Sequence, residues 1–150
     1  KAIEQPMNYN YFKFHETASY TIFPSFFIGL GIHFDSYSNI YDKHLDVANE
    51  QYTYHYNYSK NYGFSDKNYA VNGLSLNLIY DTRDNLINTN NGLFLNMNYR
   101  YNPQTDLNRH RSATLLLESR YFIPISRTNK QHVVGIWAYG QFHLRGSLRF

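Results

Sequence analysis

Hydrophobic and polar residues alternate along much of this chain, and the alternation is clearest on the two sides of one polar turn. Side chains of a β-strand point alternately to its two faces, so a period of two gives one apolar and one polar face. The turn itself, residues 81–92, has the sequence DTRDNLINTNNG and is rich in the turn formers Asp, Asn and Gly. The pattern predicts a β-hairpin over residues 74–101. Its apolar positions are Leu74, Leu76, Leu78, Tyr80, Leu93, Leu95, Met97, Tyr99 and Tyr101.

The same period predicts strands over 8–21, 26–35, 112–123 and 132–142, about six strands in all. In 26–35 the polar face carries small residues, which leave space for another element or permit the strand to bend. Glu16 interrupts the apolar face of the first stretch. Two candidate apolar faces compete in the last stretch: Val134, Ile136 and Ala138 on one side, and Val133, Trp137 and Tyr139 on the other.

Composition is compatible with a membrane β-barrel. The chain has 150 residues, one domain at most, and a mean hydropathy of −0.57. A hydropathy scan would place such a chain in water, but half of each barrel strand faces a polar lumen, which dilutes the apolar signal. The 16 Tyr and 11 Phe suit the aromatic girdles of a barrel. A tyrosine-rich soluble β-sandwich is the alternative.

Cysteine and charge exclude several other classes. The chain has no cysteine, so neither a disulfide framework nor a thiolate metal site can form. The net charge of +3 is small and dispersed, which argues against nucleic acid as a partner. No signal peptide begins at Lys1, so we expect either a mature chain or an internal fragment.

The longest irregular stretch, residues 36–68, sets the direction of the predicted strands. Outer-membrane barrels have short periplasmic turns and long outer loops, so we expect an outer loop here and a periplasmic turn at 82–92. Tyrosines alternate with polar residues over 51–58, which favours strands that extend beyond the membrane. Residues 102–110 then form a second outer loop and 126–131 a second periplasmic turn. Bacterial barrels begin at eight strands, so about six strands indicate a segment of a larger barrel.

The hairpin resembles one in a known family. An alternating strand that ends in Tyr-Asp-Thr-Arg-Asp-Asn, residues 80–85, is followed by a turn that closes on Gly92 and by an outgoing alternating strand. This series is similar to the bacterial surface antigen family, the outer-membrane barrels of BamA-like assembly factors and of two-partner-secretion transporters. Residues 111–124 and 132–142 resemble the next two strands of that family. The resemblance covers residues 73–142, roughly half of the chain.

The resemblance implies an all-β fold, an antiparallel transmembrane barrel of roughly 16 strands, in the outer membrane of a Gram-negative bacterium. It implies a non-enzymatic role without a cofactor, in the insertion of outer-membrane proteins or the translocation of polypeptides. The expected partners are outer-membrane lipid, an unfolded polypeptide and accessory subunits.

Two interpretations of the charged hairpin residues remain open. Asp81, Arg83 and Asp84 can form a hydrogen-bonded turn with a local ion pair. Alternatively, one of the two aspartates joins a polar network in the lumen, because charges inside a membrane protein need partners. The residues proposed for the family motif or this network are Asp81, Arg83, Asp84, Gly92, Arg100, Glu118, Arg120, Arg145 and Gly146.

Arg145 and Gly146 follow the last predicted strand and are therefore expected in an outer loop. The resembled family carries a hydrophobic-Arg-Gly-aromatic motif in a long loop that folds back into the lumen. Here Ser147 stands in place of the aromatic residue, and only His143 and Leu144 separate the predicted strand from Arg145. One alternative to this loop motif is a terminal strand that carries the aromatic signal of outer-membrane barrels. The other alternative is that the end of the chain says nothing about function.

Three other functions remain as alternatives to an assembly factor. Seven histidines occur without a metal-binding HExxH spacing, and no GxSxG nucleophile motif is present. A lipid-modifying barrel enzyme would use His33 with Ser36 or Ser38 at the outer rim. A passive porin-like barrel and a soluble all-β binding domain are the other two.

Overall fold

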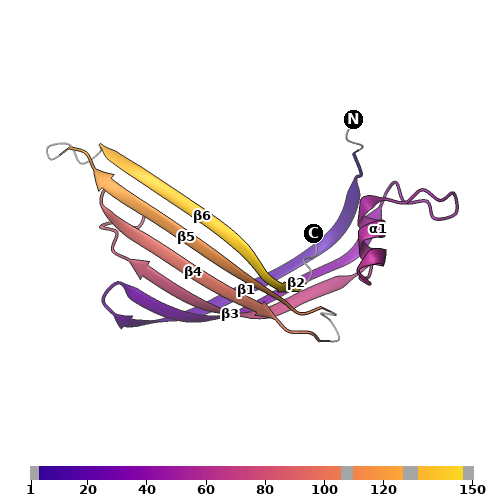
Figure 1. Cartoon of the computed structure of the whole chain (residues 1–150), viewed down its shortest axis with the longest axis horizontal. Coiled ribbons are helices and arrows are strands. Elements are labelled where there is room, and N and C mark those ends of the chain that lie inside the picture. The colour runs from indigo at the N-terminus through magenta and orange to yellow at the C-terminus, as the bar shows by residue number, and fades with distance from the viewer. Residues whose placement is uncertain (1–3, 106–109, 127–131, 147–150) are drawn as a thin grey trace.

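The structure is a computed structural model that describes residues 4–105, 110–126 and 132–146. The described residues form six long strands and one short helix (Figure 1). These are β1 (Met7–Phe23), β2 (Phe26–Asp42), α1 (Tyr54–Asn61), β3 (Tyr69–Asp81), β4 (Gly92–Asn102), β5 (Ser112–Pro124) and β6 (Val133–Gly146).

The strands form one antiparallel sheet in the order β1-β2-β3-β4-β5-β6, so each strand pairs with its neighbours in sequence. Six strands were predicted from the alternation, and all six are confirmed. The sheet is not closed into a barrel: within the described residues, β1 and β6 are each paired along one side only.

The register confirms the predicted apolar face. Residues directly opposite one another in an antiparallel pair point to the same face of the sheet. Leu78 lies opposite Met97, and Met97 lies opposite Leu117, so one row of apolar residues crosses three strands. On β6, Ile136 lies opposite Tyr121. This pairing assigns Val134, Ile136 and Ala138, rather than the competing set, to the apolar face.

The apolar face is exposed, and the buried polar side chains of the strands lie on the opposite face. Leu30 is 71% exposed and Leu74 is 61% exposed. Across the described residues, only Phe64 and Ala113 are buried hydrophobic residues. The buried polar residues of the strands are His33, Asp35, Ser75, Asn77, Asn102 and Ser112. This distribution is the reverse of that in a water-soluble domain, where apolar side chains fill the interior.

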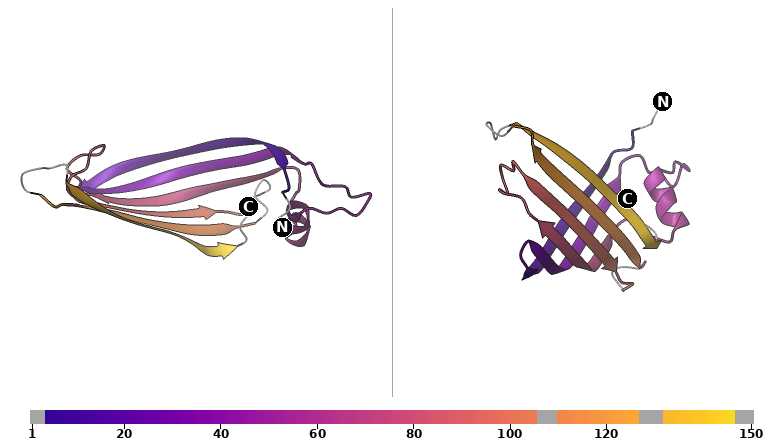
Figure 2. Two further views of the ribbon diagram at one scale, coloured as in Figure 1. Left: turned by 90° about the horizontal axis from the view of Figure 1, so that it is seen from above. Right: turned by 60° about the vertical axis from the view of Figure 1, so that its left-hand side comes forward.

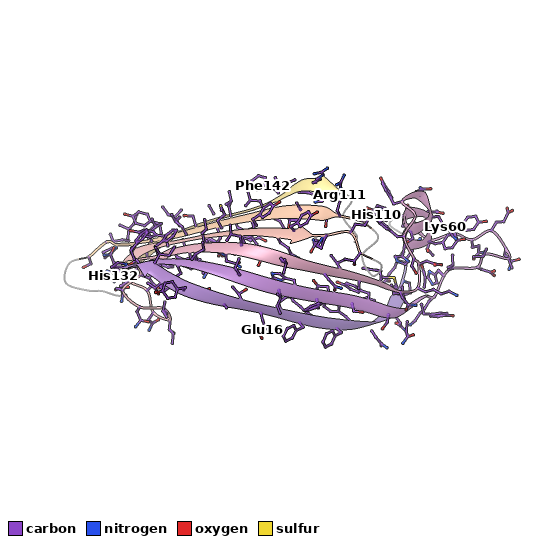
Figure 3. The ribbon with its side chains drawn as sticks, turned by 90° about the horizontal axis from the view of Figure 1, so that it is seen from below. Glu16, Lys60, His110, Arg111, His132 and Phe142 are labelled. Carbon is purple, nitrogen blue, oxygen red and sulfur yellow. The ribbon has the colours of Figure 1, made fainter. Side chains whose placement is uncertain are left out.

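One carboxylate interrupts the apolar face. Glu16 lies opposite Ile32 and is exposed on the outer side of β1 (Figure 3). It forms no ion pair with the residues that the structure describes. The predicted interruption of the apolar pattern is therefore real.

The sheet is strongly twisted and curved, and its two ends differ (Figure 2). The β1–β2 and β3–β4 connections, the end of β5 and the start of β6 lie at one end, which we call the turn end. The N-terminal part of the chain, α1 and the β4–β5 connection lie at the other end, which we call the loop end (Figure 1).

The small residues on the polar face do not leave empty space. A Cβ atom on Gly31 would lie 2.4 Å from Ser75 Oγ, and one on Gly29 would lie 2.5 Å from Ser19 Oγ. The side chains of neighbouring strands therefore occupy the volume above these glycines. The expectation that this volume would accommodate another element is wrong.

The long connection between β2 and β3 also differs from the expectation. β2 does continue past its predicted end, to Asp42, as the expectation of longer strands implied, but residues 54–61 form α1. Thr53 caps the helix, and its hydroxyl accepts a hydrogen bond from the Tyr56 N–H at 3.4 Å. Each alternating tyrosine also has another tyrosine four residues away, and residues at this spacing share a face of a helix. Tyr52 stacks on Tyr56 and Tyr58 packs on Tyr62, with ring centroids 5.5 and 4.5 Å apart.

Candidate functional site

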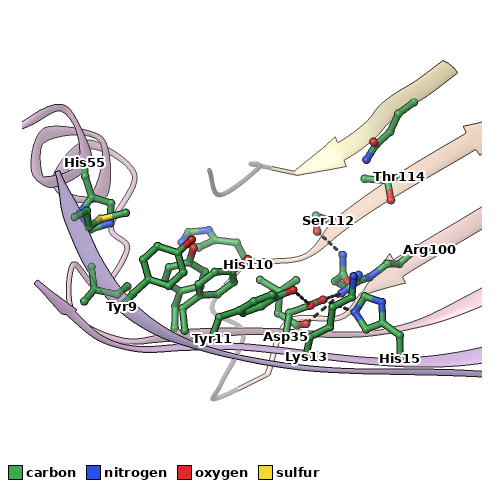
Figure 4. Close-up of a pocket in the computed structure, with 17 residues that line it drawn as sticks. Tyr9, Tyr11, Lys13, His15, Asp35, His55, Arg100, His110, Ser112 and Thr114 are labelled. Carbon is green, nitrogen blue, oxygen red and sulfur yellow. Dashed lines mark hydrogen bonds and ion pairs between the residues drawn. The ribbon is translucent and has the colours of Figure 1, made fainter. Parts of the chain in front are cut away.

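Asp35 is the centre of a charged cluster on the polar face. Its Oδ1 accepts a hydrogen bond from the Tyr11 hydroxyl at 2.6 Å. Its Oδ2 lies 2.9 Å from His15 Nε2 and 2.8 Å from Arg100 Nη2. Three strands, β1, β2 and β4, therefore contribute to one carboxylate (Figure 4). A partly buried carboxylate needs such partners, because transfer of an unpaired charge out of water is costly.

Arg100 reaches Asp35 across β3, where its Nη2 also donates to the Val71 carbonyl oxygen at 3.2 Å. A Cβ atom on Gly73 would lie 2.2 Å from Asn102 Oδ1, so the side chain of Asn102 occupies the position above Gly73. Asn102 Oδ1 accepts a hydrogen bond from Arg100 Nε at 2.8 Å, and its amide donates to Ser112 Oγ at 2.9 Å. The cluster thus continues across β4 to β5 as a connected network of polar groups.

A second polar chain lies deeper along the same face. His33 Nε2 lies 2.7 Å from Ser75 Oγ, and Asn77 Nδ2 donates to the same oxygen at 2.9 Å. Asn98 in turn donates to Asn77 Oδ1. His33 Nδ1 is buried and has no hydrogen-bond partner among the described residues.

This arrangement places His33 beside Ser75 rather than Ser36 or Ser38, the serines expected for a lipid-modifying enzyme. Ser36 lies opposite Phe12, on the apolar face. A nucleophilic serine needs access to a substrate and a histidine that a third group orients. Ser75 is only 4% exposed, and among the described residues nothing orients His33 through Nδ1. The serine–histidine contact therefore has the properties of a structural hydrogen bond.

The charged residues of the β3–β4 hairpin form a separate cluster at the turn end. Arg83 donates to Asp81 through Nε at 2.9 Å and through Nη2 at 2.6 Å, a bidentate ion pair. The hydrogen bond to Asp81 raises the pKa of Arg83 above its ordinary value. This is the local ion pair of the first interpretation, which is confirmed.

Asp84 holds the turn together rather than joining a network across the sheet. Its Oδ1 accepts backbone N–H groups of Asn90 at 3.0 Å and Asn91 at 3.2 Å. These two bonds lower the pKa of the Asp84 carboxyl below its usual range. In the part of the chain that the structure describes, neither Asp81 nor Asp84 forms an ion pair with Arg100, Glu118 or Arg120. The expectation of such a network is therefore not met.

Glu118 and Arg120 pair with each other along β5, with Arg120 Nε 2.7 Å from Glu118 Oε1. The guanidinium carbons of Arg83 and Arg120 lie 4.6 and 5.6 Å from the ring centre of Phe94. A cation over an aromatic face is attracted by the quadrupole of the ring. Phe94 thus lies between the arginines of the hairpin and of β5.

Gly92 occupies the position that closes the turn. Its φ of +125° lies in the region that favours glycine, and an added Cβ would lie 2.5 Å from the Thr82 carbonyl oxygen. Glycine is therefore required here both by conformation and by space.

Arg145 and Gly146 belong to β6 and not to a loop. Arg145 lies opposite Ala113, and Gly146 lies opposite Ser112. The expectation of an outer loop at this point is wrong, because strand pairing with β5 extends to the loop end of the sheet. Residues 147–150, which include the position expected to carry an aromatic residue, lie outside the described residues.

A cavity of about 530 Å³ opens at the loop end, beside the Asp35 cluster (Figure 4). Its charged lining residues are Lys13, Asp35 and Arg100. Three histidines, His15, His55 and His110, also line it. The remaining lining is mostly tyrosine and other hydroxyl or amide side chains.

The sequence contains a signal for the Asp35 cluster. Only three acidic residues fall on the predicted polar faces of the strands: Asp35, Asp81 and Glu118. Each of them forms an ion pair in the structure. Asp81 and Glu118 have an arginine two residues away, whereas Asp35 has no cation nearby in sequence. An inward acid without a local partner indicates that a more distant strand provides one.

Comparisons of the chain with protein-family models, with curated protein sequences and with solved structures find no match. None of the helices in the described part of the chain is long and apolar enough to cross a membrane. Within 4–105, 110–126 and 132–146, no three His, Asp or Glu side chains are grouped so as to hold a metal ion.

Proposed function

We propose that this chain forms part of an outer-membrane β-barrel of the assembly-factor or polypeptide-transporter type in a Gram-negative bacterium. The observation that supports a membrane location is the exposure of an apolar face that extends over all six strands. A water-soluble protein rarely exposes a contiguous apolar patch larger than a few hundred Å². Hydrocarbon chains of lipid would cover this face without cost.

Strand length agrees with a membrane span. The shortest strand, β4, has 11 residues. At ~3.3 Å per residue it is about 36 Å long, and a tilt of about 45° reduces its height to roughly 26 Å. The apolar band of outer-membrane barrels is about 25 Å tall. Longer strands such as β1 and β2 then extend beyond the membrane at the loop end.

The polar face fits a water-filled lumen. Among the described residues, its carboxylates are all paired with cations across or along strands, as charges inside a membrane protein need partners, and Lys13 lies at the water-exposed loop end. Outer-membrane barrels place short turns in the periplasm and long loops outside. In the proposed orientation the loop end, with α1, faces the exterior and the turn end faces the periplasm.

Closure of the barrel requires strands that pair with the free sides of β1 and β6. An open sheet edge in hydrocarbon leaves backbone groups without hydrogen bonds, which lipid cannot replace. The family resemblance implies a barrel of roughly 16 strands, within the range of bacterial barrels. Further strands of that barrel pair with both edges in our proposal.

The choice of assembly or transport rests on the resemblance of the β3–β4 hairpin to the surface antigen family. In the proposed mechanism a seam between two strands opens and offers its backbone groups to an incoming polypeptide. Templated strand pairing then satisfies groups that would otherwise face lipid. The partners are outer-membrane lipid, an unfolded outer-membrane or secreted polypeptide, and accessory subunits.

The first experiment tests the membrane face with two adjacent substitutions on β4. Leu95→Arg places a charge on the apolar face and is expected to destabilise the protein by ~2–4 kcal/mol. Asn96→Arg, on the polar face, is expected to be milder. The measurement is a urea titration of folding into lipid vesicles, followed by heat-modifiable gel mobility. Equal effects of the two substitutions would contradict a lipid-facing Leu95.

The second experiment tests the activity in proteoliposomes. We expect the reconstituted protein to accelerate insertion of an unfolded outer-membrane barrel protein. Thr17→Cys on β1 or Gln141→Cys on β6, whichever edge strand borders the opening seam, should cross-link to the incoming chain, and Asn98→Cys on the central strand β4 should not. Ion conduction without insertion would favour a passive channel. Lipid hydrolysis that His33→Ala abolishes would favour the enzyme.

A further inference from the structure

The cavity at the loop end has a composition that suits a ligand. It lies between the outer parts of β1, β2 and β3 on one side and of β4 and β5 on the other (Figure 4). Its volume of about 530 Å³ is within the usual range of small-molecule sites. The positions of Gly29 and Gly31, deeper on this face, are filled by neighbouring side chains.

The charges around the cavity do not cancel. Lys13 and Arg100 provide two positive charges, and Asp35 provides the one carboxylate in the lining. Asp35 is already engaged by Arg100, Tyr11 and His15. Lys13 is exposed and forms no hydrogen bond or ion pair with any residue that the structure describes. An occupant with a negative charge would therefore meet a cation that has no competing partner.

The neutral part of the lining is rich in hydroxyl groups. The rings of Tyr11 and Tyr69 stack on that of Tyr37, with centroids 4.5 and 4.6 Å away. Hydroxyl side chains lining the cavity are those of Tyr9, Tyr11, Tyr37, Tyr69, Ser112 and Thr114.

We propose that this cavity binds a polyhydroxylated anion, a sugar that carries a phosphate or a carboxylate, with Lys13 as the counter-charge of the anionic group. Hydroxyl groups both donate and accept hydrogen bonds, so a row of them suits the hydroxyls of a sugar. An ammonium on a flexible stem binds phosphate or carboxylate as a point charge. The proposal goes beyond the proposed function, since it concerns one end of the polar face and not the strand edges.

The test is a calorimetric titration of the full chain in detergent micelles. The probes are glucose 6-phosphate, glucuronate, glucose and inorganic phosphate. We expect glucose 6-phosphate or glucuronate to bind, and the tighter of the two identifies the anionic group. Glucose and inorganic phosphate should each bind at least ~10-fold more weakly, since each lacks one half of the ligand.

Matched variants locate the site. Lys13→Met is expected to weaken binding of the anionic sugar at least ~10-fold, equivalent to about 1.4 kcal/mol. Lys43→Met, in the loop after β2 and outside the cavity lining, should bind as the unchanged protein does. Heat-modifiable mobility shows whether each variant is folded. A folded Lys13→Met variant that keeps full affinity would overturn the proposal.

A second variant tests the hydroxyl contribution without a change of charge. Tyr9→Phe removes one phenol group and should weaken binding of the anionic sugar while leaving the weak binding of inorganic phosphate unchanged. Absence of binding by both anionic sugars would overturn the proposal, as would inorganic phosphate binding as tightly as glucose 6-phosphate. Because insertion activity is measured separately, failure here leaves the proposed function intact.

Discussion

The two ends of the sheet hold their charges in different ways. At the turn end, Asp81 and Arg83 are two residues apart, and Asp84 is bonded by backbone groups six and seven residues away. At the loop end, Asp35 is bonded by residues 20, 24 and 65 positions away in sequence. The first cluster is local to one hairpin, and the second requires β1, β2 and β4 to be in register.

This difference separates two kinds of polar site. A turn forms as soon as its own residues adopt the right backbone conformation, so its ion pair follows from a short stretch of sequence. A cluster that joins three strands depends on the register of each pair, because a slip of one residue moves a side chain to the opposite face. The loop end should therefore be more sensitive to the loss of one partner than the turn end.

The largest effect is expected from Arg100→Ala at the loop end. The change leaves Asp35, which is largely shielded from water, without its cation, and breaking such a pair costs roughly 3 kcal/mol. The measurement is the urea midpoint of folding in lipid vesicles. Arg111→Ala, which removes an exposed arginine from the same end, should change the midpoint little. Similar midpoints for the two variants would contradict a central role of the Asp35 cluster.

Gly92→Ala should have the next largest effect, at the turn end. The residue has a positive φ, and the added Cβ would lie 2.5 Å from the Thr82 carbonyl oxygen, so a loss of about 2 kcal/mol is expected. Gly63 also has a positive φ, of +67°, but its Cβ would meet no atom within 4 Å. Gly63→Ala should therefore lower the free energy of unfolding by less, about 1 kcal/mol, in the urea titration. If Gly63→Ala lowered the free energy of unfolding more than Gly92→Ala, backbone conformation alone, and not close contact of the added Cβ, would explain the need for glycine at these positions.

Arg83→Ala tests the local ion pair directly. The backbone N–H of Arg83 also donates to Asp81 Oδ1, at 3.1 Å, and this hydrogen bond survives the substitution, so we expect the free energy of unfolding to fall by about 1 kcal/mol. The folding titration of Arg83→Ala should thus show a smaller shift than that of Arg100→Ala. If Arg83→Ala were the more damaging, the contrast between the two ends would be wrong.

The smallest effect is a pH dependence at Asp84. Hydrogen bonds from the Asn90 and Asn91 N–H groups lower the pKa of this carboxyl in the folded protein. Its contribution to stability is therefore complete above the unfolded pKa, about 3.9, and is lost as pH falls through the lower folded pKa. Asp84→Asn should narrow the difference between folding midpoints at pH 7 and pH 3. An unchanged difference would show that Asp84 does not take part in acid destabilisation.

Several features of the fold could be predicted because they repeat over a few residues. The alternation of Leu74, Leu76 and Leu78 identified both a strand and its exposed face, and the Asn-rich turn identified the hairpin. The same reasoning failed for α1, where tyrosines spaced two apart are also spaced four apart, and a capping threonine favoured the helix. It also failed for Arg145, because the length of β6 follows from pairing with β5.

The sequence by itself determined the six strands and the apolar and polar sides of most of them, since both depend on neighbouring residues, and it offered the ion pair between Asp81 and Arg83 as one of two interpretations. Only the tertiary structure decided which face of β6 is apolar and which residues surround Asp35. Both follow from the register between strands, which hydrogen bonds set across the sheet and which no single stretch of the chain encodes. The cavity beside Lys13 has the same origin, because strands distant in sequence enclose it only when all are paired.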